Sequence, residues 1–421
     1  MTTESNRPPA VIMGLGHPRQ TAFVKSLSRA GVPVHALYGE RNVYVHSRRL
    51  TQFHEFSDDP QLQLSQLEAL GQKLGRAFLV PTNDDYVALV ARNRDRLSRH
   101  FIIPSPDWSV VGAIFDRDEC YAKARSIGIR VPRYWLPDSD AAMQEIVAAL
   151  QPEVSDYIIK TPSILSAPAN EAATRLSKAA PKPLEDILSS CVELKQRTGE
   201  YPMIQEVVPG QADSAVGVTM IVSPKGKVVL AYCVRRLRLA SYRIDAGYVH
   251  PYELGSVVWC ETTHDDEAVA AARELVRAFD YTGQITIEFR RDSRDGSLYL
   301  MKVEPRPVRA TSLSTAIGMD IPTILYRTFL GEAVEVPRDY PDGVGWLWTM
   351  AYGQSLYYNP HHNRRDVLRV LRSWHRIRAF AEDYGDPVPL IRWAVGRTAR
   401  AVLPRERSLA PTVAGKPARL S

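Results

Sequence analysis

Four side chains in the middle of the chain could together bind a magnesium-bound polyphosphate. Glu288 and Glu304 fall on opposite arms of a hairpin predicted within residues 283–303, and Arg306 follows the second arm. Carboxylate oxygens are ligands that magnesium prefers, and cations such as Arg306 and Lys160 neutralise phosphate charge. Each of these residues alone is more simply explained as a surface ion pair or a solvated lysine. The hypothesis therefore depends on their order along the chain.

The elements that precede these residues alternate between apolar strands and amphipathic helices. A strand at 10–13, a helix at 21–30 and a strand at 32–37 form a β-α-β unit in which Gly31 stops the helix. The rhythm then continues with helices at 62–74 and 84–97 and strands at 77–80 and 101–103. This order predicts an open, doubly wound α/β domain with a parallel sheet, up to about Val111.

A glycine pair follows the first predicted strand. Gly14 and Gly16 invite comparison with a dinucleotide-binding loop, but the third glycine is missing and Glu40 is the nearest candidate for a ribose-binding acid. The pattern therefore favours a tight turn between strand and helix over binding of NAD.

The middle of the chain mixes helices with paired strands. Strands are predicted at 157–160 and 203–208, an antiparallel pair at 216–222 and 227–234, and helices at 116–126, 183–197 and 264–279. This mixture predicts an α+β domain rather than a continuation of the first sheet. Adjacent antiparallel strands bring side chains on one face within reach of each other, as a binding site requires.

The order of these motifs resembles the ATP-grasp superfamily, and within it the bacterial carboxylate-amine ligase-like proteins, from about residue 10 to residue 330. FDRDECYAKARSIGIRVP (115–132) and YIIK (157–160) are similar to two segments that contact ATP phosphates in that family. MIQEVVPG (203–210) is similar to the hinge between its two lobes, and RRLRLASYRIDAG (235–247) to the basic strand and loop near its acceptor site. GQITIEFRRDSRDGSLYLMKVEPRPVRATS (283–312) resembles its metal-binding hairpin.

The resemblance implies a fold and a division into domains. Residues 1–111 would form the N-terminal pre-ATP-grasp domain, and 112–335 the ATP-grasp domain, with lobes at about 112–207 and 208–335. A helical C-terminal extension at 336–404 and a disordered tail at 405–421 would follow.

The resemblance also implies ATP and magnesium as cofactors and assigns residues to them. Glu288 and Glu304 would bind the metal, and the catalytic arginines would be Arg306, Arg236 and Arg238. The residues that would bind the nucleotide are Arg117, Lys160, Lys178, Gln205, Glu206, Val207, Val208 and Asp213.

Two features depart from the family pattern. Lys302 stands where the family has its second metal-binding glutamate, and Glu304 stands where it has asparagine. An ammonium cannot ligate magnesium, so Glu288 and Glu304 would hold a single ion. The predicted phosphate-covering segment, residues 161–178, also contains no glycine.

Two functions remain open at this point. The first is an ATP-dependent carboxylate-amine ligase, which would form an amide through an acyl phosphate and release ADP and phosphate. The second is a nucleotide-binding homologue whose altered metal site no longer supports turnover. The sequence identifies neither the carboxylate nor the amine, and it leaves the oligomeric state open, with a homodimer as one option.

The basic surplus of the chain is confined to its C-terminal end. Lys and Arg total 53 against 47 Asp and Glu, but 13 of these cations and only 5 of the acids lie at 361–421. A nucleic-acid-binding role for the whole protein is therefore disfavoured. Val367, Leu368, Leu371, Trp374 and Ile377 share one face of a predicted helix whose other face carries arginines. We expect that apolar face to pack on the protein's own core, while contact with an anionic membrane is the alternative.

Cysteine usage and the N-terminal sequence favour a reducing compartment. The four cysteines are widely spaced and form no CxxC pair, which indicates neither a zinc site nor a disulfide framework. The sequence has no signal-like N-terminal segment and no run of about 18 apolar residues. We therefore expect a cytoplasmic protein.

Overall fold

The N-terminal part of the molecule is a five-stranded parallel sheet with the strand order β3-β2-β1-β4-β5. The computed structural model describes residues 7–39, 42–152, 154–166, 173–176, 183–239, 257–358, 364–389 and 391–392. The strands are β1 (Ala10–Met13), β2 (Val34–Tyr38), β3 (Gln52–Glu55), β4 (Ala77–Pro81) and β5 (Phe101–Ile102). The helices are α1 (Pro18–Arg29), α2 (Pro60–Leu74), α3 (Asp84–Arg92), α4 (Arg94–Leu97) and α5 (Trp108–Phe115).

This sheet confirms the predicted doubly wound α/β fold. Apolar side chains fill both of its faces, so β1 is buried along its whole length. The edge strand β3 was not predicted, because its sequence QFHE is polar and half exposed and gives little apolar signal. Gly14 and Gly16 have φ values of 111° and 96°, and a side chain at Gly14 would collide with Gln20. The glycine pair is thus explained by a tight turn.

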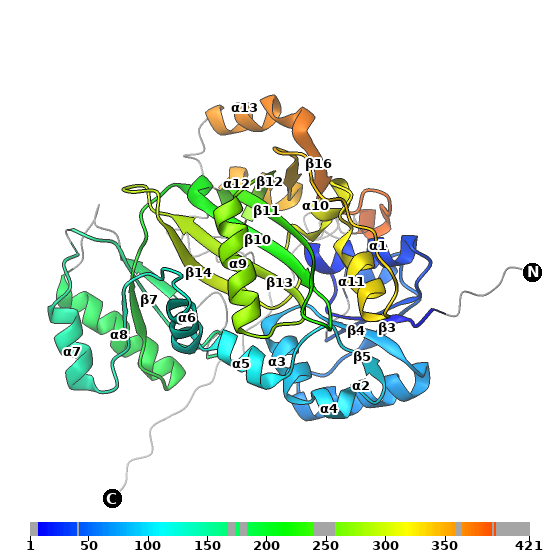
Figure 1. Cartoon of the computed structure of the whole chain (residues 1–421), viewed down its shortest axis with the longest axis horizontal. Coiled ribbons are helices and arrows are strands. Elements are labelled where there is room, and N and C mark those ends of the chain that lie inside the picture. Colours follow the sequence, from blue (N-terminus) through cyan, green and yellow to red (C-terminus); the bar gives the residue numbers. More distant parts are fainter. Residues whose placement is uncertain are drawn as a thin grey trace, which may run out of the picture.

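A four-stranded antiparallel sheet with the order β6-β9-β7-β8 forms a separate lobe, seen beside α7 and α8 in Figure 1. Its elements are β6 (Tyr134–Trp135), α7 (Asp140–Ala148), β7 (Tyr157–Lys160), β8 (Ala173–Leu176), α8 (Leu184–Thr198) and β9 (Met203–Glu206). Ile159 and Ile204 pack on the two helices. Because side chains alternate along a strand, Lys160 and Gln205 point from the opposite face of this sheet.

The largest sheet has seven strands in the order β14-β13-β10-β11-β12-β15-β16. One face packs on α9, and the other shares a core with the N-terminal domain and α11. The elements are α6 (Arg117–Ser126), β10 (Ala215–Val222), β11 (Val228–Leu239), β12 (Val257–Thr263), α9 (Asp266–Ala278), β13 (Gly283–Arg291), β14 (Leu298–Glu304), α10 (Thr311–Ala316) and α11 (Ile321–Phe329).

The C-terminal extension is partly helical, as predicted, but it also completes the large sheet. It contributes α12 (Thr349–Tyr358), α13 (Arg364–Arg372), β15 (Gly345–Leu347) and β16 (Ile377–Phe380). The two strands were not predicted, because each is a very short run without clear turn residues on both sides. The helix predicted to include Ile377 ends at Arg372 instead, since Ile377 begins β16. The tail at 405–421 lies outside the described residues.

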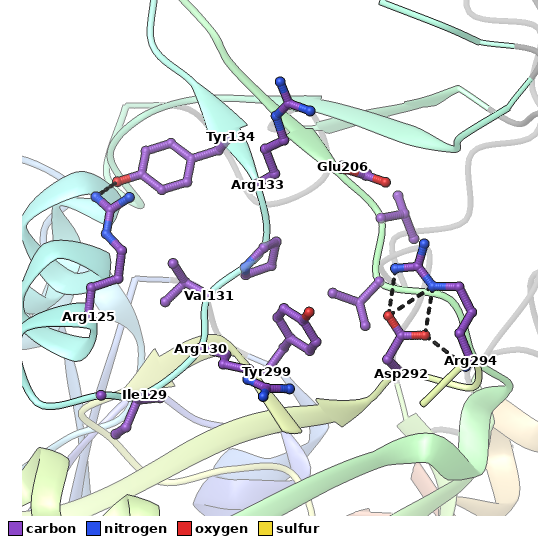
Figure 2. Close-up of a pocket in the computed structure, with 14 residues that line it drawn as sticks. Arg125, Ile129, Arg130, Val131, Arg133, Tyr134, Glu206, Asp292, Arg294 and Tyr299 are labelled. Atoms are coloured by element: carbon purple, nitrogen blue, oxygen red, sulfur yellow. Dashed lines mark hydrogen bonds and ion pairs between the residues drawn. The ribbon is translucent and has the colours of Figure 1, made fainter. Parts of the chain in front are cut away.

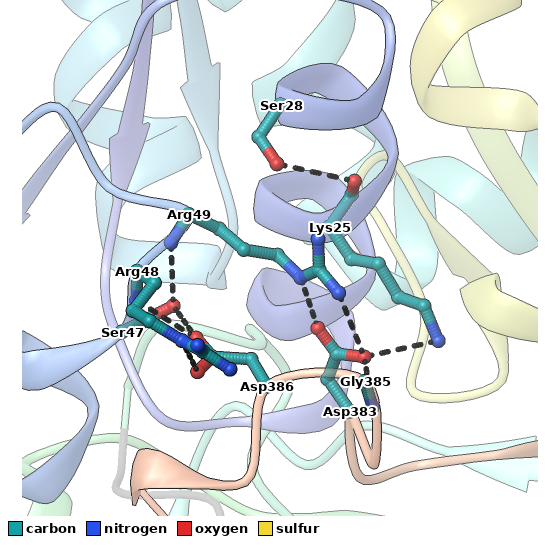
Figure 3. Close-up of polar contacts among 8 residues, drawn as sticks. All are labelled: Lys25, Ser28, Ser47, Arg48, Arg49, Asp383, Gly385 and Asp386. Atoms are coloured by element: carbon teal, nitrogen blue, oxygen red, sulfur yellow. Dashed lines mark hydrogen bonds and ion pairs between the residues drawn. The ribbon is translucent and has the colours of Figure 1, made fainter.

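The segment that follows β16 fastens the extension to the N-terminal domain (Figure 3). Asp383 forms ion pairs with Arg49 and with Lys25, the latter at 3.2 Å. Asp386 accepts hydrogen bonds from the Ser47 hydroxyl at 2.6 Å and from the Arg48 backbone N–H at 2.9 Å. Both carboxylates are buried. These contacts therefore hold the C-terminal extension against the N-terminal domain.

Two further expectations concern the whole chain. The four cysteines are buried and free, as the absence of a disulfide pattern predicts. Among the described residues, no helix is long and apolar enough to cross a membrane.

Candidate active site

The predicted metal hairpin forms, and its charged side chains share one face of the large sheet. In the register of β13 and β14, Glu288 lies opposite Lys302 and Thr286 opposite Glu304. The Lys302 ammonium donates to Glu304 Oε1 at 2.7 Å. This contact confirms that residues two apart on β14 point the same way. The opposite face of the hairpin is apolar and packs on α9.

Arg306 connects this hairpin to the N-terminal domain. Its Nε donates to Asp84 Oδ1 at 2.6 Å and its Nη2 to Glu304 Oε1 at 3.1 Å, and its side chain is buried. Burial alone would lower the pKa of the Arg306 guanidinium, but Glu304 and Asp84 outweigh burial and raise it. Burial alone would likewise raise the pKa of Glu304, but Arg306 and Lys302 lower it. Asp84, Glu304 and Arg306 are therefore charged near neutral pH.

Arg236 reaches Glu288 across a strand that lies between them. Arg236 is on β11 and Glu288 on β13, and both pair with β10, where Gly217 lies opposite Glu288. The Arg236 side chain spans β10 and forms an ion pair with Glu288. Burial would lower the pKa of Arg236, but Glu288 outweighs burial and raises it.

A second group of cations lies at the N-terminus of α1. The Arg19 side chain is only 9% exposed, and its buried Nε has no hydrogen-bond partner. Burial and the nearby Arg306 and Arg309 hold the pKa of Arg19 well below its usual value. Burial and the nearby Arg236 also lower the pKa of Arg309, to about 10. Both shifts have the same physical causes: burial is the larger, and the positive charge of neighbouring arginines adds to it.

His17 caps α1 and contacts both Arg309 and the C-terminal extension. Its Nε2 accepts a hydrogen bond from Arg309 Nε at 3.2 Å, and its ring meets Trp348 edge to face at 5.8 Å. Burial and the nearby Arg19 hold the pKa of His17 well below its usual value, so the ring is neutral. Since Nε2 is the acceptor, Nδ1 carries the proton, and this buried donor has no partner.

β7 of the smaller sheet and the start of α6 bring two more cations toward the hairpin. Lys160 Nζ donates to Gln205 Oε1 at 2.6 Å, and the Arg117 side chain donates from Nε to the Thr161 carbonyl at 3.0 Å. Burial, Arg117 and Lys302 hold the pKa of Lys160 well below its usual value. Burial also lowers the pKa of Arg117. Lys160 and Arg117 therefore belong to the same electropositive region as Lys302.

The predicted hinge lines a cavity of about 560 Å³ (Figure 2). Glu206 accepts a hydrogen bond from Ser155 Oγ at 3.0 Å, and the Glu206 and Val207 amides donate to the carbonyls of Arg133 and Asp156. The Val208 amide, in contrast, has no acceptor within the described part of the chain. The hinge thus offers a free N–H beside an apolar wall. The lining includes Val131, Pro132, Val207, Val208, Tyr299 and the Asp292–Arg294 ion pair.

Three predicted residues lie apart from this cluster or outside the described chain. Arg238 sits over the Tyr352 ring of α12, with its Cζ 5.3 Å from the ring centroid. Asp213 is exposed on a 3-10 turn at Ala212–Ser214. Lys178 lies outside the described residues.

Sequence reasoning missed four residues of the site. Asp84, His17, Arg19 and Arg309 are contributed by α3, by the start of α1 and by the loop after β14. Arg309 follows Arg306 by three residues, which was a usable signal. Asp84 and Arg306 are 222 residues apart, so only the tertiary structure brings them together.

The carboxylates of the site match one magnesium ion rather than a closed metal site. Among the described residues, no group of three or more His, Cys, Asp or Glu side chains is arranged to hold a metal. Magnesium in nucleotide sites is commonly held by one or two carboxylates together with phosphate oxygens. Glu288 and Glu304 supply two such carboxylates, so the residues fit a single magnesium ion bound with a polyphosphate.

Comparison with solved structures identifies the fold. The chain is similar to N5-carboxyaminoimidazole synthetase from Staphylococcus aureus in complex with ADP, with a TM-score of 0.55, 14% identity and coverage of 79% of this chain and 80% of that one. It is also similar to the biotin carboxylase domain of the Hydrogenobacter thermophilus 2-oxoglutarate carboxylase, crystallised with MgADP, ADP and bicarbonate. The TM-score there is 0.58, the identity 11% and the coverage 80% and 73%.

The same fold appears in a fungal structure, carboxyaminoimidazole ribonucleotide synthase from Aspergillus clavatus in complex with ATP. Its TM-score is 0.55 and its identity 14%, and 78% of each chain is covered. No protein-family model matches the sequence, and no curated protein matches it significantly. At 11–14% identity these likenesses establish the fold alone: the chain has the ATP-grasp fold that its sequence predicts.

Proposed function

We propose that the chain is an ATP-dependent carboxylate-amine ligase that uses magnesium. The observation that carries this proposal is the meeting of buried cations at the metal hairpin, contributed by α1, α6, β7 and the loop after β14. Arg19, Arg117, Lys160, Arg306 and Arg309 are each buried or electrostatically coupled to that cluster. Such a concentration of positive charge is costly without a ligand, and a triphosphate together with a carboxylate would neutralise it.

The reaction has two steps. A carboxylate oxygen attacks the γ-phosphorus of ATP, the bond to the β,γ-bridging oxygen breaks, and ADP leaves. The amine nitrogen then attacks the carbonyl carbon of the acyl phosphate, phosphate leaves, and the nitrogen loses a proton to give the amide. Catalysis of phosphoryl transfer of this kind consists mostly of positioning and charge neutralisation.

Each part of the nucleotide would meet a different element of the site. Lys160 and Arg117 would contact the phosphates, and Arg306 would neutralise the transferred phosphoryl group. The free Val208 amide would donate to the adenine ring, and the Glu206 backbone would lie beside it. ADP or ATP is bound in the Staphylococcus and Aspergillus proteins described above, which supports this assignment.

Magnesium would be held by Glu288 and Glu304 together with phosphate oxygens. When bound, it supplies positive charge to the β- and γ-phosphates. Lys302 already donates to Glu304, so it would share that carboxylate with the metal and neutralise charge that a second ion would otherwise neutralise. Glu288, which forms an ion pair with Arg236, would likewise share its carboxylate between Arg236 and the metal.

The carboxylate substrate would bind at the α1 end of the cluster. Arg19 supplies a buried Nε–H without a partner, His17 Nδ1–H supplies a second unpartnered donor, and Arg309 adds positive charge beside them. Arg236, on the basic strand β11, is close enough to Arg309 for its positive charge to lower the pKa of Arg309. Arg238 would act at the edge of the pocket beside Tyr352. These contacts favour a carboxylate that carries no positive charge close to the reacting group.

Amine-dependent release of ADP tests the proposal. Purified protein is incubated with ATP, magnesium and a panel of carboxylates, with hydroxylamine as a general amine, and hydroxamate and ADP are measured together. We expect equal amounts of both products from at least one carboxylate, and neither product from the Lys160→Met variant. ATP binding without ADP release on any pair would instead favour the non-catalytic homologue. A homodimer stays a prediction.

A further inference from the structure

The outer face of α13 carries exposed apolar side chains. Leu368 is 48% exposed and Leu371 61%, while Val367 is 37% exposed. Trp374, in the 3-10 turn Trp374–Arg376 that follows the helix, is 51% exposed. Val370, on another side of the helix, is buried in the core beside Trp346. The helix is therefore attached to the protein through Val370, and its apolar row faces solvent. This arrangement overturns the expectation that the apolar face packs on the protein's own core.

Aromatic rings continue this apolar row beyond the end of the helix. The ring of Trp374 lies 6.0 Å from that of Phe380, and Phe380 meets Tyr384 edge to face at 5.5 Å. Tyr384 is itself 52% exposed. Leu368, Leu371, Trp374, Phe380 and Tyr384 form what we name the α13 patch. Figure 1 shows α13 at the outer edge of the molecule, beyond β16.

Exposed arginines border the α13 patch. Arg369, Arg372, Arg376 and Arg378 are all exposed, and no ion pair involves Arg372, Arg376 or Arg378 within the described part of the chain. The acidic residues that follow β16 do not offset this charge at the surface. Glu382, Asp383 and Asp386 are buried, and they accept hydrogen bonds from the backbone and the N-terminal domain. The border of the patch is thus strongly positive.

We propose that the α13 patch docks on an anionic membrane surface. Leucines can enter the boundary between headgroups and acyl chains, and Trp and Tyr rings are favoured at that depth. Unpaired arginines around the patch complement the negative charge of lipid headgroups, and their long stems can extend outward to reach it. A protein partner is less well matched, because charge is depleted at protein interfaces, whereas exposed arginines border this patch.

This docking is independent of the ligase reaction. The α13 patch lies on the extension, and none of its residues belongs to the proposed nucleotide site. Membrane contact would hold the enzyme at a surface through side chains of the patch alone. A failure of the docking proposal would therefore leave the ligase proposal untouched.

Co-sedimentation with vesicles tests the docking proposal. The full-length protein is mixed with vesicles of phosphatidylcholine alone and with vesicles that also contain phosphatidylglycerol. We expect binding to the anionic vesicles at least about tenfold tighter than to the neutral ones, and weaker in about 1 M salt because exposed charges are screened. Equal binding to both vesicles, or none to either, would overturn the proposal.

Two variants locate the contact. Leu371→Glu should lower anionic-vesicle binding by about tenfold or more, because it places a charge in the apolar row. Leu62→Glu is the matched control, since Leu62 is 56% exposed on α2, far along the chain from the patch. If Leu371→Glu proves unstable, vesicle binding is measured on Trp374→Ala instead, and its thermal midpoint shows whether that variant is folded. Unchanged binding by both patch variants contradicts the proposal. Loss of a wild-type dimer in Leu371→Glu, seen by sedimentation velocity without vesicle binding, would assign the patch to self-association instead.

Discussion

Replacement of Arg19 by methionine should stabilise the protein and impair its function at the same time. Arg19 is 9% exposed, its Nε has no partner, and Arg306 and Arg309 lie close enough to lower its pKa. Methionine has a similar length and no charge. Replacing buried charges with apolar side chains of similar volume is often neutral or stabilising by about 1–4 kcal/mol. Because Glu304 and Asp84 already compensate part of the Arg19 charge, we expect Arg19→Met to raise the free energy of unfolding by about 1–3 kcal/mol.

Thermal unfolding and substrate kinetics measure the two effects. For domains of roughly 150–250 residues, 1 kcal/mol corresponds to about 2–4 °C in the unfolding midpoint, so Arg19→Met should raise that midpoint by several degrees. The same variant should lower kcat/KM for the carboxylate by about a factor of 10–150, the loss of one charge-assisted hydrogen bond. Arg49→Met is the control, because the Arg49 side chain is also mostly buried but is paired with Asp383, and its replacement should lower the midpoint. A midpoint that falls in both variants would refute the view that Arg19 is an uncompensated cation.

Three further predictions concern other parts of the site and fold. Lys160→Met should weaken ATP binding by about 10–150-fold in calorimetry, because one charge-assisted hydrogen bond is lost. The same variant should not lower stability, since Lys160 is buried among other cations. Unchanged ATP affinity would contradict the phosphate-binding role of Lys160. Glu304→Gln should abolish magnesium-dependent turnover, whereas Lys302→Glu should raise magnesium affinity, and turnover indifferent to Glu304→Gln would rule out the single-metal site. Burial would raise the pKa of Asp383, but Arg49 outweighs burial and lowers that pKa. The Asp383 carboxylate therefore stabilises the fold above its unfolded-state pKa of about 4, and this stabilisation is lost as the pH falls below about 4. The midpoint difference between wild type and Asp383→Asn should therefore persist from neutral pH to about pH 5 and vanish in stronger acid, and a difference that is independent of pH would contradict the pairing.

The fold was predictable where strands and helices alternate strongly. The β-α-β unit at β1, α1 and β2 and the hairpin of β13 and β14 follow from apolar periodicity and turn residues. β3, β15 and β16 were missed because each is very short and lacks a clear apolar alternation. Their place is decided by a neighbouring strand that needs hydrogen-bond partners, and sequence patterns do not record that need.

The site was predictable only in the part that local sequence positions. Lys302 and Glu304 had to share a face, because strand alternation fixes their direction. The partners of the hairpin could not be read in the same way. Arg236 reaches Glu288 only because β11 and β13 lie on either side of β10, and Asp84 meets Arg306 only because two sheets pack together.

The outward-facing row on α13 shows the limit of helical periodicity. The sequence correctly identified an amphipathic helix with Leu368 and Leu371 on one side. Periodicity gives the relative positions of apolar and charged residues but not which side the protein covers. That choice depends on how Val370 and β16 attach the helix to the sheet, which is a tertiary property.

Positional isotope exchange tests the ligase proposal most directly. ATP labelled with oxygen-18 in the β,γ-bridge is incubated with enzyme, magnesium and a carboxylate that supports hydroxamate formation, but without any amine. Reversible formation of an acyl phosphate lets the β-phosphate of bound ADP rotate, so the label should move to non-bridging positions in recovered ATP. We predict exchange that requires the carboxylate and disappears in Glu304→Gln. Amide formation without carboxylate-dependent exchange, under conditions in which bound ADP can rotate and ATP can re-form, would contradict an acyl-phosphate ligase.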